Sequence, residues 1–255
     1  MVKVLLNYAS ENNVILKLNE KDNDENYPLL RSLKNNNNEM AEILMNYAKE
    51  NNIILKINEK DEDDDNPILY TVKKRENNKM VKILMNYAKQ INVILELNEK
   101  DCCDRYPLIC AIENNSNEMV KLLINYAKRN NFSLELNEKD IFGGYPLLYA
   151  VKNNNKEMVK TLMNYANKTN AILELNRKNN YGYYPLLCAV KGNDNKVVKI
   201  LMNYANEIHS ILELNEKDRN DNYPLLCAVK EDNNEMIKLL MNYANKINVI
   251  LILFA

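Results

Sequence analysis

The stretch that decides the fold runs Asp140-Ile-Phe-Gly-Gly-Tyr-Pro-Leu-Leu-Tyr-Ala-Val-Lys-Asn-Asn-Asn-Lys-Glu-Met-Val-Lys-Thr-Leu-Met-Asn-Tyr-Ala166, because close copies of it recur along the whole chain. Its proline recurs at steps of 39, 40, 39, 39 and 39 residues, at Pro28, Pro67, Pro107, Pro146, Pro185 and Pro224. The triplet Asn-Tyr-Ala keeps the same spacing. A fixed period of this size predicts a solenoid, in which each supersecondary unit buries its apolar face only against its neighbours.

Each unit is expected to contain two antiparallel helices. Pro146 suits the first position of a short helix, which ends at the Asn-rich stretch 153–155, because Asn tolerates the left-handed conformation of a helix C-terminus. A second helix begins near Glu157, and its apolar residues recur at helical spacing on one face. Residues 172–179 predict an extended segment that leads to a hairpin tip. The asparagines that recur in this segment are expected to connect adjacent hairpins, at Asn19, Asn58, Asn98, Asn137, Asn176 and Asn215.

The order Tyr-Pro-Leu-Leu-x-Ala, Asn-rich turn, Glu-Met-Val-Lys-x-Leu-Met and Leu-Asn-Glu-Lys-Asp resembles the ankyrin repeat, whose signature includes Thr-Pro-Leu-His-x-Ala. The resemblance covers the whole chain and implies an all-α solenoid of helix–turn–helix repeats with short β-hairpin or extended connections. We expect a single domain, 1–255, made of a half unit 1–21 and the units 22–60, 61–100, 101–139, 140–178, 179–217 and 218–255. A period near 40 also fits HEAT-type helix pairs, but the short first helix and the Leu-Asn-Glu-Lys-Asp segment argue against them.

The sequence departs from the family pattern in two respects. Tyr or Asn replaces the family Thr before each proline, so the usual hydroxyl N-cap is missing. The units exceed the usual 33 residues by about six. These extra residues fall before the Leu-Asn pair and imply a longer second helix or a longer outer loop.

Composition excludes several classes of function. The 34 basic and 35 acidic residues give a net charge of −1, which argues against a nucleic-acid or membrane surface. No window predicts a membrane span, and the first residues are too short in apolar length for a signal peptide. There is one histidine, His209, and no Cys-x-x-Cys, nucleophile elbow or phosphate-binding Gly loop, so we expect no metal, no cofactor and no enzymatic activity.

The cysteines favour a reducing environment. Five are present, and Cys110, Cys188 and Cys227 share one repeat position, as small core residues would. This favours an intracellular location, and we expect the cytoplasm, with the nucleus as the alternative. The vicinal pair Cys102-Cys103 lies at a hairpin tip, where it is either two small apolar contacts at a binding surface or a redox- or metal-sensitive spot.

The resemblance also implies where a partner binds, since ankyrin proteins usually hold their partners on a concave face of hairpin tips and first-helix ends. Carried over by position, the tips offer as anchors Cys102, Cys103, Arg105, Ile141, Phe142, Tyr181 and Tyr183. Lys152 and Lys191 end their first helices. They either form a basic strip that complements an acidic partner segment flanked by apolar side chains, or stabilise the helix C-terminus.

The sequence therefore predicts a non-enzymatic protein–protein interaction module. The alternative is a structural spacer, or a fragment of a longer array, with no dedicated partner. Met1 begins inside a second helix, and residues 249–255 form an apolar run without the polar outer face that terminal repeats normally have. Either the array continues beyond these residues, or its ends associate.

Overall fold

The computed structural model describes residues 2–75 and 77–252, and these residues form helices and no strand. The helices are α1 (Val2–Glu11), α2 (Pro28–Lys34), α3 (Asn38–Glu50), α4 (Pro67–Lys73), α5 (Asn78–Gln90), α6 (Pro107–Glu113), α7 (Asn117–Arg129), α8 (Pro146–Lys152), α9 (Lys156–Thr169), α10 (Pro185–Lys191), α11 (Asn195–Glu207), α12 (Pro224–Lys230) and α13 (Asn234–Lys246). The predicted all-α repeat fold is confirmed, and its connections are turns and extended segments.

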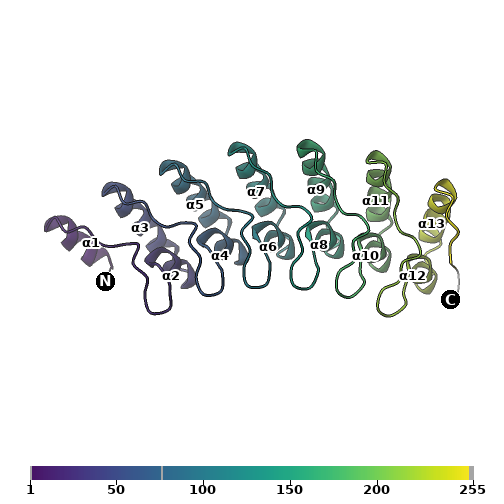
Figure 1. The fold of residues 1–255 in the computed structure, drawn as a ribbon, viewed down its shortest axis with the longest axis horizontal. Helices are drawn as coiled ribbons and strands as arrows, with labels where there is room; N and C mark the ends of the chain where they lie inside the picture. The colour runs from purple at the N-terminus through teal and green to yellow at the C-terminus, as the bar shows by residue number, and fades with distance from the viewer. Residues whose placement is uncertain (1, 76, 253–255) are drawn as a thin grey trace. The chain divides into compact units, whose positions relative to one another are not determined.

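The chain divides into two compact units. Unit 1 comprises Met1–Asn114 with Leu122–Leu134, and unit 2 comprises Asn115–Lys121 with Glu135–Ala255. Within unit 1 the short helices α2, α4 and α6 form one row, and the longer α3 and α5 form a second row (Figure 1). Unit 2 repeats this arrangement, with α8, α10 and α12 in one row and α9, α11 and α13 in the other (Figure 1). The short helices α2, α4, α8, α10 and α12 each pack against the long helix that follows, and consecutive short helices within each unit pack against each other.

Proline fixes the start of every short helix. Each of these helices has 7 residues with Pro at its first position, and most of its side chains are buried. The preceding tyrosines, such as Tyr145, make no side-chain cap, whereas Asn66 accepts a hydrogen bond from the Leu69 N–H at 2.9 Å. Tyr145 is instead buried, and its hydroxyl donates to the Arg177 carbonyl at 2.8 Å. The residue that replaces the family's cap thus joins the start of the short helix to the extended segment of the same repeat.

Left-handed residues close both turns of the repeat. The predicted positions between the helices have positive φ, for example 53° at Asn154 and 49° at Asp232. A second left-handed residue follows each long helix, as Asn170 does with a φ of 54°. Because this residue lies one or two positions after a helix of 13 or 14 residues, the extra length of the repeat lies in the helix. Of the two alternatives, the structure favours the longer helix.

The recurrent asparagines join neighbouring repeats, as predicted, but they join the extended segments and not the hairpin tips. Asn176 donates to the Ile211 carbonyl at 2.7 Å and accepts from the Glu213 N–H at 3.0 Å. Asn137 makes the same pair of bonds to Ile172 and Glu174. Each side-chain amide therefore makes hydrogen bonds between neighbouring extended segments, as backbone groups do between the strands of a sheet.

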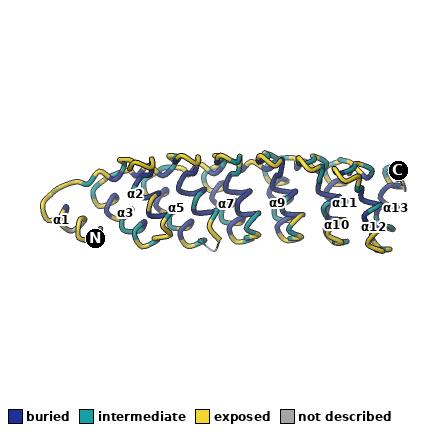
Figure 2. Tube along the Cα trace, turned by 90° about the horizontal axis from the view of Figure 1, so that it is seen from below, coloured by how far each residue is buried: buried dark blue, intermediate teal, exposed yellow. Residues whose placement is uncertain are grey.

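The core of each unit lies between its two rows of helices. Buried positions follow α2–α13, whereas the connecting loops are largely exposed (Figure 2). Leu147, Leu162 and Ala150 are fully buried, and each buried large aliphatic side chain contributes about 1.5–3 kcal/mol. Ser32 and Thr71 occupy the repeat position of Ala150 in the earlier repeats. Their hydroxyls donate to the backbone carbonyls of Leu29 and Pro67, both at 2.6 Å, as a buried hydroxyl requires.

Candidate functional site

A loop of six residues, which we call a finger, projects before each short helix (Figure 1). The fingers are residues 22–27, 61–66, 101–106, 140–145, 179–184 and 218–223. Each begins with Asp or Asn, whose side chain accepts two backbone N–H groups of its own finger. Asp140 accepts from Phe142 at 2.9 Å and from Gly144 at 2.8 Å. Asn179 accepts from Tyr181 and Tyr183, both at 2.9 Å.

Sequence reasoning missed these first finger residues. A signal was present, because Asp or Asn stands five residues before the Tyr or Asn of every Tyr-Pro or Asn-Pro pair. Such side chains bond their own backbone two residues on and hold a turn without a sheet. The fingers are thus positioned by their own Asx residue as well as by the helices.

Neighbouring fingers in unit 2 are joined through their backbones. Asn180 donates from its N–H to the Phe142 carbonyl at 3.0 Å and from its side chain to the Ile141 carbonyl at 2.9 Å. Gly143 has a φ of +75°, and a Cβ there would lie 2.7 Å from Oδ1 of Asn180. A Cβ at this position would crowd Asn180, so glycine favours this approach. The fingers hold their side chains side by side as a result.

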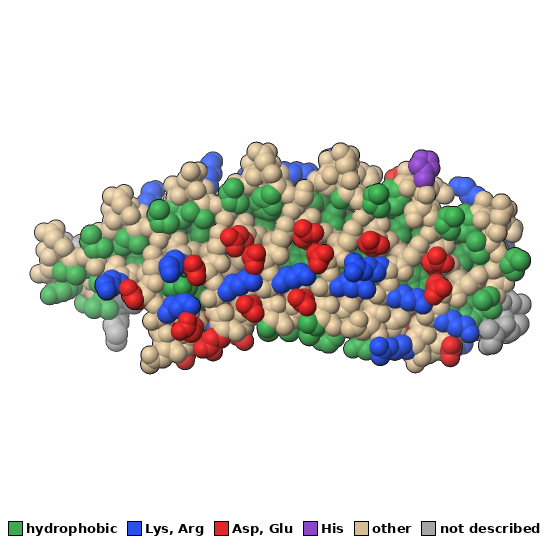
Figure 3. Space-filling view, in the orientation of Figure 1, with side chains coloured by type: hydrophobic (Ala, Val, Ile, Leu, Met, Phe, Trp, Pro, Cys, Tyr) green, Lys and Arg blue, Asp and Glu red, His purple; other side chains and the backbone are tan. Residues whose placement is uncertain are grey.

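Three of the predicted anchors in unit 2 are exposed apolar or aromatic side chains. The exposed fractions are 46% for Ile141, 49% for Phe142 and 49% for Tyr181. Hydrophobic side chains gather along the finger edge in the space-filling view (Figure 3). The guanidinium of Arg219 lies 5.8 Å from the centre of the Tyr181 ring. Tyr183, also a predicted anchor, is half-buried.

The lysines at the ends of the short helices have a role that the sequence did not reveal. Lys191 forms an ion pair at 3.1 Å with Asp218, the first residue of the next finger, and lies 4.7 Å from the centre of the Tyr183 ring. Burial opposes the charge of Lys191, but its hydrogen bond to Asp218 raises its pKa. In unit 1, Lys34 pairs in the same way with Asp61 at 2.7 Å. These lysines hold the next finger in place.

Lys152 differs from Lys191 because the next finger begins with Asn179 in place of an aspartate. Lys152 is exposed, and no carboxylate in the described part of the chain forms an ion pair with it. Both lysines lie near Cys188, whose pKa burial raises to about 12 against the opposing effect of the two positive charges. Lys152 and Lys191 therefore border one area of unit 2, and only Lys191 is neutralised.

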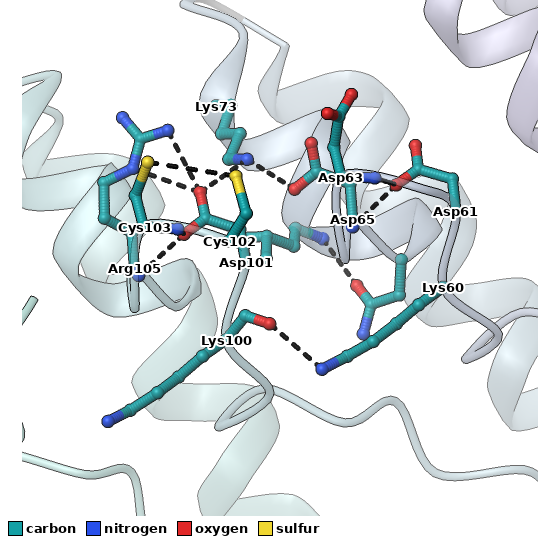
Figure 4. Close-up of polar contacts among 12 residues, drawn as sticks. Lys60, Asp61, Asp63, Asp65, Lys73, Lys100, Asp101, Cys102, Cys103 and Arg105 are labelled. Carbon is teal, nitrogen blue, oxygen red and sulfur yellow. Dashed lines mark hydrogen bonds and ion pairs between the residues drawn. The ribbon is translucent and has the colours of Figure 1, made fainter. Parts of the chain in front are cut away.

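The fingers of unit 1 carry a denser ionic network (Figure 4). Lys73 bridges Asp65 and Asp101, with a distance of 2.7 Å to Asp101. Arg105 contacts the same Asp101 carboxylate through Nε at 3.1 Å and a terminal nitrogen at 3.0 Å. Burial favours the neutral form of Asp101, but its contacts with Lys73 and with backbone N–H groups lower its pKa. Arg105, a predicted anchor, is thus half-buried in a structural ion pair.

The vicinal cysteines lie at the tip of the finger that contains Arg105. Cys102 is exposed, Cys103 is half-buried, and their sulfur atoms are 3.9 Å apart (Figure 4). The hydrogen bond between the two thiols raises the pKa of Cys102, which disfavours the nucleophilic thiolate. The geometry accordingly gives more support to a pair of contact residues than to a reactive thiol.

Among residues 2–75 and 77–252, no group of three or more His, Cys, Asp or Glu side chains is arranged to hold a metal ion. None of the helices described combines the length and the apolar character that crossing a bilayer requires.

Comparison with known proteins agrees with this architecture. The family model for ankyrin repeats (3 copies) matches residues 90–172, 128–211 and 169–250. Together these matches cover more than half of the chain, which therefore belongs to the ankyrin-repeat family. No match was found among curated proteins.

Solved structures show the same fold. An ankyrin repeat domain from Acinetobacter baumannii is 19% identical, with a TM-score of 0.63 and coverage of 86% of this chain and 98% of that chain. The ankyrin repeat domain of Bcl-3, described as a unique member of the IkappaB family, is 18% identical, with a TM-score of 0.63 and coverage of 93% and 91%. Ankyrin repeats are generally protein–protein interaction modules and are typically non-enzymatic.

Proposed function

We propose that this chain is a non-enzymatic protein-binding module that holds its partner on the fingers of unit 2. The observation that carries the proposal is the pair Phe142 and Tyr181, each 49% exposed on neighbouring fingers that share backbone hydrogen bonds. Aromatic side chains are enriched in interface cores, and clustered exposed apolar groups mark interaction sites. Ile141 and Tyr183 extend the same surface.

The charges beside these aromatics define the chemistry of the partner. Lys152 has no ion pair with a described carboxylate, whereas Lys191 is paired with Asp218. A partner segment with a carboxylate next to apolar side chains would complement both Lys152 and the aromatic pair. Lys152 is therefore expected to contribute more to binding than Lys191.

In unit 1 the predicted contacts remain Cys102, Cys103 and Arg105. Since the Arg105 guanidinium is already paired with Asp101, the exposed thiol of Cys102 is the side chain most open to a partner. All five cysteines are free, and we infer from these unpaired thiols that the protein works in a reducing, intracellular compartment.

The test begins with affinity capture from lysate and mass spectrometry, which supplies a partner whose affinity can then be measured. Phe142→Ala/Tyr181→Ala should weaken that affinity at least about tenfold, because buried aromatic anchors contribute most of the binding energy. Ile211→Ala is the matched control, since Ile211 is 53% exposed on an extended segment away from the fingers. Thermal unfolding of all variants should stay unchanged.

Two outcomes decide between the proposal and its alternatives. If every captured protein binds the double variant as tightly as the wild type, the fingers of unit 2 are not the binding surface. If no protein is captured above the background of an unrelated helical protein, the chain acts as a structural spacer. Lys152→Glu should weaken binding more than Lys152→Met, because reversal adds repulsion of the partner's carboxylate.

A further inference from the structure

Unit 1 contains a second candidate surface, on its long helices and not on its fingers. A groove of about 590 Å³ lies between α5 and the C-terminal half of α7. Its floor includes Met85 and Leu122, which are half-buried, and Tyr126, which is buried. The volume falls within the range of ordinary ligand pockets, and it accommodates a few side chains of a bound segment.

The rim of this groove is basic. Lys82, Lys89 and Arg129 line it, and all three are exposed. Helix α5 contains no acidic residue, and neither does the part of α7 from Leu122 to Arg129. No carboxylate of the described residues forms an ion pair with Lys89 or Arg129. A local excess of positive charge is unusual in a chain whose net charge is −1.

The cations of this groove are not required by the repeat. Two repeats later, in the corresponding positions of α9 and α11, Asn167 replaces Lys89 and Glu207 replaces Arg129. Those helices nevertheless pack against each other. Since packing tolerates Asn and Glu at these positions, the contacts between the long helices do not require Lys89 and Arg129. The difference between the repeats instead points to recognition.

We propose that this groove binds an acidic segment of a protein partner, which places an apolar side chain on Met85 and Leu122 between carboxylates that contact Lys89 and Arg129. The apolar floor favours a protein segment over a nucleic acid. Nucleic-acid binding rests mainly on many phosphate contacts, and the only aromatic ring of the groove, that of Tyr126, is buried and cannot stack on a base.

The site is independent of the fingers, so the two proposals can fail separately. The experiment uses a random peptide library displayed on phage, selected on the full chain and depleted on Lys89→Asn/Arg129→Glu. This variant copies residues that α9 and α11 already carry, so it should fold. Selected peptides should contain a Leu, Ile or Phe flanked by Asp or Glu. No enrichment, or enrichment of neutral or basic peptides, would overturn the proposal.

A synthetic copy of the most enriched peptide then gives the quantitative test, by fluorescence anisotropy. Lys89→Asn/Arg129→Glu should weaken its binding at least about tenfold, as loss of two charge pairs at an interface does. Phe142→Ala/Tyr181→Ala should leave it unchanged. A peptide with Lys in place of its acidic residues should bind Lys89→Glu/Arg129→Glu better than the wild type. Absence of this charge-swapped rescue, or equal competition by a DNA duplex, would contradict a groove that is specific for acidic protein segments.

Discussion

The aspartate at the first position of the last finger both accepts backbone N–H groups and forms an ion pair. One finger has asparagine at this position, which accepts the N–H groups but forms no ion pair. Asp218 accepts the N–H groups of Asn220 and Asn222 at 2.8 and 3.0 Å and pairs with Lys191 at 3.1 Å. Asn179, in the preceding repeat, accepts the corresponding N–H groups without a charge. An Asp-to-Asn exchange at Asp218 should therefore keep the backbone hydrogen bonds of the turn and remove the ion pair, together with the contact of 3.2 Å between the Asn222 side-chain amide and the second carboxylate oxygen.

We expect Asp218→Asn to lower the free energy of unfolding by about 1–2 kcal/mol at neutral pH, since the carboxylate is buried and charge-assisted. Burial raises the pKa of Asp218, but the N–H groups of Asn222 and Asn220 and the contact with Lys191 lower it below the ordinary 3.8. A lowered carboxyl pKa gives stability that is complete above the unfolded-state value and is lost as pH falls through the folded value. The difference between variant and wild type should thus shrink below about pH 4.

Urea unfolding followed by circular dichroism at a series of pH values measures this difference. Asp221→Asn is the control, because Asp221 sits at the exposed tip of the same finger, with 85% of its side chain accessible and Lys217 only at 3.9 Å. It should change stability by less than about 0.5 kcal/mol. An Asp218→Asn effect that does not depend on pH would mean that the turn, and not the charge, is what the aspartate stabilises.

Among the larger elements, the extended segments depend on a single recurring amide. Asn176→Ala removes two hydrogen bonds between repeats, at 2.7 Å to the Ile211 carbonyl and 3.0 Å from the Glu213 N–H. At about 0.5–1.5 kcal/mol per bond, the variant should lose about 1–3 kcal/mol in chemical denaturation. Asn176→Asp, which keeps the acceptor, should fall between it and the wild type.

Asn164→Ala provides the comparison, because Asn164 is exposed in the middle of α9 and alanine favours helix. It should be neutral or slightly stabilising. If Asn176→Ala is equally neutral, the amide does not connect the segments in solution, and the stacking of neighbouring repeats rests on the helices alone.

The helices could be predicted from sequence because their determinants are local. Pro146 fixes the start of α8, and the Asn-rich turn after it has the expected left-handed residue at Asn154. The ion pairs of the fingers could not be predicted, because Lys191 and Asp218 are 27 residues apart and come from different repeats. From the sequence alone, contact with a partner and the helix dipole each explain the lysines at the ends of the short helices. The ion pair of Lys191 with Asp218 is evident only in the fold, which brings the next finger close to the lysine. That Phe142 and Tyr181 bind a partner stays a prediction, since exposure alone identifies no ligand.

At the scale of the whole molecule, the α12–α13 pair of unit 2 exposes apolar side chains whose counterparts in the preceding repeat are buried. Val190 is 1% exposed and Met202 is 7% exposed, whereas the residues at their repeat positions, Val229 and Met241, are 38% and 50% exposed. Helix α12 packs against α10, and α13 packs against α11. Residues that other repeats bury are thus open to solvent here, and such a surface favours association.

We therefore predict that the chain associates reversibly with a second copy through its α12–α13 faces, because one apolar patch can pair with itself about a twofold axis. Sedimentation velocity across a wide concentration range should show a shift from monomer to dimer. Val229→Glu/Met241→Glu should abolish the shift, since pairing would then bury like charges without partners. Lys238→Glu, an exposed change on α13, should leave the dimer intact. A wild-type chain that stays monomeric at its highest attainable concentration would contradict the prediction. Dimerisation that survives the double substitution would also contradict it. Either result would mean that the exposed apolar face of α12 and α13 does not mediate self-association.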